Sequence, residues 1–128
     1  MSAKAQAVLR LQIPFCSRAC AFCGRSPLPG WDSSRLHAYV QALCAELRAN
    51  GDSFSDREIA AVRIGGGNAT ALTGEDLWDL YRTVRENYDL DPQAPVTILA
   101  SPFQISGGRL AFYNRLPIRR YDYELYSL

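Results

Sequence analysis

Three cysteines stand close together near the start of the chain, in the run Cys16-Ser17-Arg18-Ala19-Cys20-Ala21-Phe22-Cys23. Cysteine thiolates are the usual protein ligands of iron-sulfur clusters. A cubane cluster has four irons, so a CxxxCxxC arrangement can hold three of them and leave one iron open for chemistry. The spacing therefore predicts that Cys16, Cys20 and Cys23 bind a 4Fe-4S cluster.

Two other interpretations of these cysteines stay open. A closed zinc site needs four ligands, usually from CxxC pairs or histidines, and His37, the one histidine of the chain, lies apart from the cysteine run. Three loop cysteines could also pack as small apolar side chains. The fourth cysteine, Cys44, falls on the apolar face of an expected helix, and we expect it to pack in the core.

A second candidate site is the glycine run Gly65-Gly66-Gly67-Asn68-Ala69-Thr70. Glycine permits positive φ angles and a close approach of the backbone to a ligand. A glycine triplet alone is also typical of a tight turn without a ligand. Its place directly after an apolar segment, together with the cysteine run, favours a cofactor-binding loop.

Four segments are expected to form the strands that position these loops. Residues 7–13 alternate apolar and polar side chains and end at Pro14, which indicates a strand. Residues 59–64 and 96–100 are short and apolar, as in buried strands. Residues 120–126 are expected to form a fourth strand, with Tyr121, Tyr123 and Leu125 on one face.

Helices are expected between these strands. Apolar residues recur at helical spacing over residues 36–47 and again over residues 77–84, where Thr73 and Asp76 form a candidate capping pair. A weaker helical segment covers residues 108–114. The first helix has candidate caps on both sides, at Asp32, Ser33 or Ser34 before it and at Asn50-Gly51 after it.

The alternation of strands and helices predicts an α/β fold with a parallel sheet and right-handed crossovers. Both candidate loops then follow the carboxyl ends of strands, where the active groups of barrel enzymes lie. Four strands do not close a barrel. We therefore expect a truncated portion of a larger protein, or self-association through the exposed fourth strand.

Length and composition set the protein class. The 128 residues suit one domain, and 48% hydrophobic with 21% charged residues excludes disordered and fibrous classes. Fourteen basic and thirteen acidic residues give a net charge of +1, which argues against recruitment by nucleic acid or an anionic membrane surface. The sequence shows neither a run of about 20 apolar residues nor a signal peptide, so the cytoplasm is the expected location.

Several motifs resemble the radical S-adenosylmethionine (SAM) superfamily, most closely its oxygen-independent coproporphyrinogen III oxidase-like branch. They are Ile13-Pro14-Phe15-Cys16 leading into CxxxCxxC, the glycine run, and Thr97 to Pro102. The resemblance covers nearly all of residues 1–128 but only the first half of the family's catalytic barrel. It implies a single radical SAM core domain, its N-terminal portion, built from parallel βα repeats that form about half of a partial TIM-type barrel.

The resemblance also implies a function. In the family, a 4Fe-4S cluster held by the three cysteines binds SAM and cleaves it reductively to a 5'-deoxyadenosyl radical. The residues that match its cofactor-binding motifs are Phe22, Gly65, Gly66, Gly67 and Asn68. Expected partners are a small-molecule substrate, for which the relatives suggest a tetrapyrrole, and an electron donor such as flavodoxin or ferredoxin. A non-catalytic iron-sulfur or haem-binding module derived from the family, and a zinc-binding domain, are the alternatives.

The chain departs from the family pattern at several positions. Arg10 and Gln12 stand where the branch commonly has a tyrosine and a histidine, and Leu99 stands where it commonly has an acidic residue that contacts the cofactor. Arg25 replaces a further cysteine of the oxidases, and Asn68-Ala69 replaces Thr-Pro. These departures favour a divergent relative over the oxidase itself.

Overall fold

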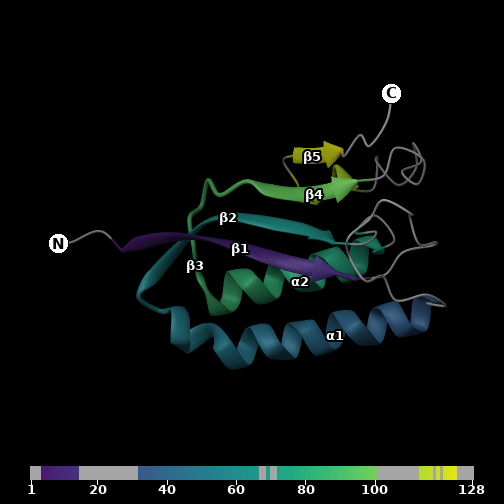
Figure 1. Cartoon of the computed structure of the whole chain (residues 1–128), viewed down its shortest axis with the longest axis horizontal. Coiled ribbons are helices and arrows are strands. Elements are labelled where there is room, and N and C mark those ends of the chain that lie inside the picture. Colours follow the sequence, from purple (N-terminus) through teal and green to yellow (C-terminus); the bar gives the residue numbers. More distant parts are fainter. Residues whose placement is uncertain are drawn as a thin grey trace.

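The computed structural model of the chain describes residues 4–14, 32–66, 69, 72–100, 113–116, 118 and 120–123. Within them lies one parallel β-sheet with two long helices (Figure 1). The strands are β1 (Ala5–Ile13), β2 (Arg57–Gly66), β3 (Asp89–Leu90), β4 (Val96–Ala100) and β5 (Arg120–Tyr123). The order across the sheet is β1-β2-β4-β5, and β3 pairs with the start of β2.

The strand predictions are confirmed for the described residues, and every strand pairing is parallel. The two-residue strand β3 was not predicted, because two residues have no periodicity to detect. The expected strand over residues 120–126 is found over 120–123, and its remainder lies outside the described residues. Most of the expected helix over residues 108–114 lies outside them as well.

Helix α1 (Ser33–Asn50) begins at one of its predicted caps. The Asp32 side chain accepts a hydrogen bond of 2.8 Å from the backbone N–H of Arg35, which satisfies a donor that the first helical turn leaves free. The helix buries a stripe of side chains at helical spacing, formed by Leu36, Val40, Cys44 and Leu47. Cys44 is 1% exposed, so the prediction that it packs in the core is confirmed.

Gly51 ends α1 for a different reason from the one expected. Its φ of −57° is right-handed, and the chain continues into the short 3-10 helix η1 (Gly51–Phe54) instead of turning through a left-handed residue. A Cβ at position 51 would lie only 2.6 Å from the carbonyl oxygen of Asn87, the last residue of the second helix. Glycine is therefore needed here because the ends of two helices meet closely.

Helix α2 (Gly74–Asn87) begins with the predicted capping pair. The Thr73 hydroxyl accepts a hydrogen bond of 3.1 Å from the Asp76 N–H, and the Asp76 carboxylate accepts one of 3.4 Å from the Thr73 N–H. This reciprocal capping box fixes where the helix starts. Leu77, Leu80 and Val84 then form its buried face.

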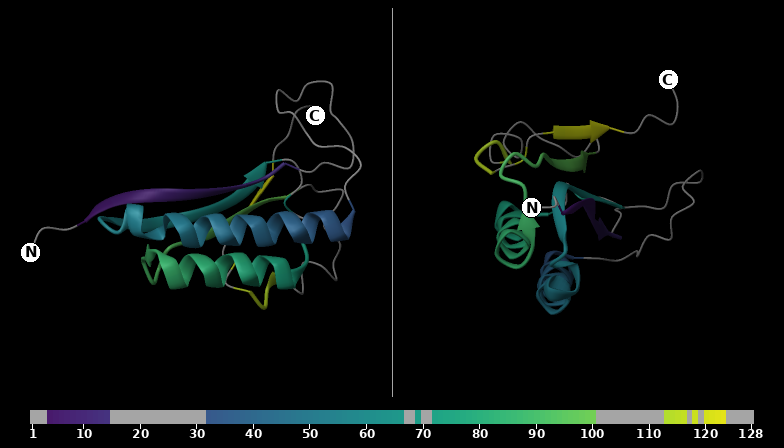
Figure 2. Two further views of the ribbon diagram at one scale, coloured as in Figure 1. Left: turned by 90° about the horizontal axis from the view of Figure 1, so that it is seen from below. Right: turned by 90° about the vertical axis from the view of Figure 1, so that its left-hand side faces the viewer.

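Both helices lie on the same side of the sheet (Figure 2). The core fills the space between them and the sheet face that carries Leu11 and Ile13 of β1 and Val62 and Ile64 of β2. Because side chains alternate along a strand, the polar residues between these positions point to the opposite face. Among the described residues, no helix is long and apolar enough to cross a membrane.

Candidate functional site

The carboxyl ends of β1 and β2, which precede or begin the two candidate loops, are paired in the sheet. Gln12 pairs in register with Gly65, and Ile13 pairs with Gly66. The cysteine run begins at Cys16, three positions after Ile13, and the glycine run begins inside β2 itself. The end of β1, which precedes the cysteine run in the sequence, thus lies directly beside Gly65 and Gly66 at the end of β2 (Figure 1).

Only part of the predicted site can be placed. The described residues include Gly65 and Gly66 of the candidate set. The predictions that fall on the cysteine run and on the end of the glycine run concern residues outside the described ranges, namely Cys16, Cys20, Phe22, Cys23, Gly67 and Asn68.

The two described glycines have different structural reasons to lack a side chain. Gly66 has a φ of +117°, and a Cβ there would lie 2.7 Å from the carbonyl oxygen and 2.9 Å from the nitrogen of Ile13. A Cβ at Gly65 would lie 3.4 Å from the Cβ of Leu99, which is ordinary contact. Gly66 therefore permits the close approach of β1 and β2, whereas Gly65 keeps a surface of the sheet open.

That open surface is the floor of a cavity of about 140 Å³. The cavity lies on the face of the sheet opposite the core, because its residues Arg10 and Gln12 alternate along β1 with the buried Leu11 and Ile13. The backbone of Gly65 and Gly66 contributes to it. The side chains around it come from four strands and are Arg10, Gln12, Arg63, Thr97, Leu99 and Asp122. Most of these side chains are polar, in contrast to the apolar core on the other face.

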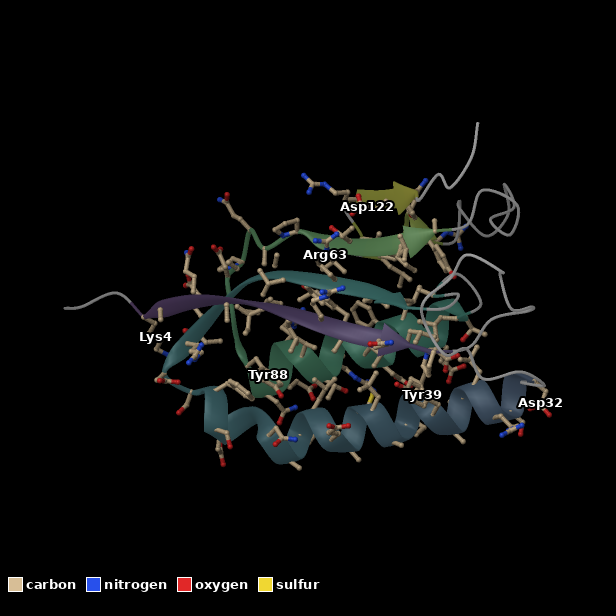
Figure 3. All side chains as sticks on the ribbon, viewed as in Figure 1. Lys4, Asp32, Tyr39, Arg63, Tyr88 and Asp122 are labelled. Carbon is tan, nitrogen blue, oxygen red and sulfur yellow. The ribbon has the colours of Figure 1, made fainter. Side chains whose placement is uncertain are left out.

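An ion pair crosses this face. The Arg63 guanidinium of β2 lies 3.1 Å from the Asp122 carboxylate of β5, so the pair spans the intervening strand β4 (Figure 3). Sequence reasoning did not find this pair, because the two residues become neighbours only through the strand order β2-β4-β5. The alternation of side chains along residues 7–13 was the available signal that Arg10 and Gln12 share a face.

Leu99 forms an apolar part of the cavity wall. It stands where the related proteins were expected to carry an acidic residue, and its side chain has no hydrogen-bonding atom. Its register partner on β5 is Asp122, which places a carboxylate on the neighbouring strand. The acidic group at this end of the cavity therefore comes from β5 and is paired with Arg63.

Helix α1 holds the end of β1 in place. The Tyr39 hydroxyl donates a hydrogen bond of 2.6 Å to the carbonyl oxygen of Gln12, next to the point where the cysteine segment leaves the strand (Figure 3). Burial raises the pKa of Tyr39 above its ordinary value of 10.0, so the hydroxyl remains a donor at neutral pH. This bond fixes the position of the strand end relative to the helix.

His37 contacts the start of the second helix. Its Nδ1–H donates to the Asp76 carboxylate at 2.8 Å, and this hydrogen bond raises the pKa of His37 above 6.5. Asp76 is 2% exposed and also caps α2. His37 is not among the described residues that surround the cavity, and its contact with Asp76 joins the starts of the two helices.

Within the described residues, no group of three or more histidine, cysteine or acidic side chains could hold a metal ion. Cys44 is a buried free thiol on α1, apart from the cavity residues. The described part of the chain thus offers no second metal site that competes with the one predicted from the cysteine run.

Comparison with known proteins gives relatives but no match to a family model. The chain is 31% identical over 97 residues to the oxygen-independent coproporphyrinogen III oxidase of Salmonella typhimurium, covering 76% of this chain and 21% of that protein. It is 37% identical over 90 residues to anaerobilin synthase of Escherichia coli O157:H7, covering 69% and 20%. It is 25% identical over 118 residues to the heme chaperone HemW of Haemophilus influenzae, covering 88% and 30%.

Comparison of the fold with solved structures identifies the same group of proteins. The structure superposes on coproporphyrinogen III oxidase (HemN) from Escherichia coli, described as a radical SAM enzyme, with a TM-score of 0.83 and 25% identity. The match covers 94% of this chain and 27% of that one, so the chain corresponds to about a quarter of the larger protein. The expected parallel α/β fold of a partial radical SAM barrel is confirmed, and the sheet is not closed. The chain therefore belongs with the oxygen-independent coproporphyrinogen III oxidase-like branch of the radical SAM proteins.

Proposed function

We propose that the chain is the cofactor-binding part of a radical SAM enzyme. In this proposal Cys16, Cys20 and Cys23 hold a 4Fe-4S cluster, and the glycine run binds SAM beside it. The observation that carries the proposal is the register of β1 and β2, which pairs Ile13 with Gly66 and so starts both segments at one edge of the sheet. Barrel enzymes place their active groups at this edge.

The described residues fit such a cofactor. Gly65 lacks the side chain that would occupy the cavity floor, so backbone groups there are accessible to a bound molecule. When bound, the cluster and SAM supply reductive cleavage of the sulfonium to a 5'-deoxyadenosyl radical. The chain's own residues supply the thiolates, an open backbone surface and the polar cavity wall. In the proposal Phe22, Gly67 and Asn68 complete the cofactor contacts.

The substrate class follows from the names of the relatives. Coproporphyrinogen, anaerobilin and heme are the molecules that those names give, and all are tetrapyrroles or products of tetrapyrroles. We accordingly propose a tetrapyrrole-like substrate and an electron donor such as flavodoxin or ferredoxin. Because the chain spans 20% to 30% of these relatives, turnover of a substrate is proposed for the barrel that contains this part.

A second candidate function is a non-catalytic iron-sulfur or haem-binding module. Two observations favour it: Leu99 is apolar where an acidic cofactor contact was expected, and one relative is named a heme chaperone. The two functions differ in whether bound SAM is cleaved, which a direct product assay can decide.

Anaerobic reconstitution of the full chain with iron and sulfide tests cluster binding. We expect about four irons and four sulfides per chain, and near-complete loss of both in Cys16→Ala, Cys20→Ala and Cys23→Ala. Cys44→Ala is the matched control, because Cys44 is buried in the core and should not affect iron content. Equal iron loading in all four variants would show that the ligand assignment is wrong.

Reduction of the loaded protein with SAM separates the two candidate functions. The enzymatic proposal predicts a change in the cluster spectrum on SAM addition and the formation of 5'-deoxyadenosine and methionine. A loaded cluster that neither responds to SAM nor yields 5'-deoxyadenosine supports the binding module instead. Tightly bound zinc without sulfide would contradict both and support a structural zinc site.

A further inference from the structure

The described side chains around the cavity carry more positive than negative charge, and the negative charge is paired with only one of the two arginines. Arg10 on β1 pairs in register with Arg63 on β2, which puts two guanidinium groups on neighbouring strands at the same level of the sheet. Like charges directly opposite each other in a sheet destabilise it. Asp122 is the one carboxylate among the described residues that surround the cavity, so the formal charge of these described residues is +1.

Only one of the two arginines has its charge compensated. Arg63 is paired with Asp122 at 3.1 Å. Arg10 forms no ion pair or side-chain hydrogen bond with any described residue, although its side chain contributes to the cavity wall. The Arg63–Asp122 pair also holds the Arg63 guanidinium toward β5, away from β1. Among the described residues around the cavity, Arg10 is thus the cation that remains available to a ligand.

The surroundings of Arg10 suit an oxyanion. Gln12 follows two positions later on the same face of β1 and offers an amide donor. Thr97 on β4 is the register partner of Arg63 and offers a hydroxyl group. The absent side chain at Gly65 leaves room between these groups. Arginine binds carboxylate and phosphate through a planar fork of N–H donors, which makes a guanidinium in a polar cavity a suitable receptor for either.

We propose that the cavity binds an oxyanion, a carboxylate or a phosphate, with Arg10 as the group that contacts it. The site is formed by side chains of the sheet and does not need the cysteine cluster, so it can be tested separately from the proposed function. Its position beside Gly65 and Gly66 puts the anionic group of a ligand next to the proposed cofactor loop. The carboxylate can come from a substrate or from SAM, and the experiment distinguishes these sources.

Calorimetric titration of the full chain with succinate and with inorganic phosphate, at constant ionic strength, tests the proposal. We expect Arg10→Gln to weaken binding by about tenfold or more, since a charge-assisted hydrogen bond is lost. Asp122→Asn should strengthen binding several-fold, because it releases Arg63 and raises the cavity charge to +2. Succinamide, which has the same carbon skeleton without charge, should not bind.

Arg85→Gln is the matched control for net charge. Arg85 is an exposed arginine of α2 and is not among the described residues that surround the cavity. An equal loss of affinity in Arg85→Gln and Arg10→Gln would show that the net charge of the protein causes the loss of oxyanion binding. That result would overturn the proposal. Equal affinity of the wild type and Arg10→Gln would also overturn it. Circular dichroism of each variant confirms that the fold is intact.

A second arm identifies the source of the oxyanion. Binding of SAM to the reconstituted chain is compared between the wild type and Arg10→Gln. A parallel loss of SAM and succinate affinity identifies the anion as the cofactor's carboxylate. A loss of succinate affinity alone identifies a second ligand. If reconstitution fails, the titrations of the iron-free chain still decide whether the oxyanion site exists, so failure of the proposed function is distinguishable.

Discussion

Gly66 has two structural reasons to lack a side chain, a positive φ angle and the close approach of β1. Its φ of +117° is strained for any residue with a Cβ, and that Cβ would lie 2.7 Å from the Ile13 carbonyl oxygen. We expect Gly66→Ala to lower the free energy of unfolding by about 1–3 kcal/mol, measured by urea denaturation. Gly65→Ala is the control, because its Cβ would meet Leu99 at an ordinary 3.4 Å and should change stability much less. Equal stabilities of the two variants would contradict this account.

The sequence predicted that Gly65 and Gly66 follow a buried strand, and they lie at the end of β2; their role in binding a cofactor stays a prediction. It also predicted that Cys44 packs in the core. The Arg63–Asp122 pair could not be predicted, since the two residues are 59 positions apart and meet only in the folded sheet. The role of Gly51 was also missed, because its cause is the carbonyl oxygen of Asn87 on another helix.

At the scale of elements, the starts of the two helices are coupled through His37 and Asp76. The hydrogen bond to the Asp76 carboxylate raises the pKa of His37 above 6.5 in the folded state. The protonated imidazole therefore stabilises the fold fully below about pH 6.5, and this contribution is lost as the pH rises through the raised pKa. We expect the free energy of unfolding to fall from pH 5.5 to pH 7.5 in urea titrations.

His37→Gln is the matched variant for this prediction. Glutamine keeps a hydrogen-bond donor but does not titrate, so the fall in stability over this pH range should largely disappear. A change in stability caused by histidine titration can be assigned to His37, because it is the one histidine in the sequence. A variant with the same pH dependence as the wild type would show that the His37–Asp76 contact does not contribute.

Helices α1 and α2 were the most predictable elements. Each combines an apolar stripe at helical spacing with a side-chain cap at Asp32 or Thr73, so local and tertiary signals agree. The contact between His37 and Asp76 was not predicted, because it depends on how the two helices lie side by side. The strand β3 escaped prediction because its two residues pair with β2 only through the tertiary fold.

For the whole molecule, the apolar core and the cavity lie on opposite faces of the sheet. The core lies between the sheet and the helices and contains Cys44 but none of the other candidate site residues in the described ranges. We therefore expect removal of iron by a chelator to leave the helical circular dichroism signal intact while the cluster absorbance disappears. Loss of the helical signal would contradict this expectation and indicate a metal-dependent fold, as in structural zinc domains.

The hydrogen bond from Tyr39 to the Gln12 carbonyl oxygen also bears on how far the length of the connection between β1 and α1 can change. It anchors one end of the connection between β1 and α1, and the Asp32 cap anchors the other. With both ends fixed, lengthening the connection costs only loop-closure entropy, about 0.6 kcal/mol for each doubling of its length. Insertions between residues 14 and 32 should thus barely affect thermodynamic stability, whereas under the proposed function they should abolish cluster binding if they change the spacing of the three thiols.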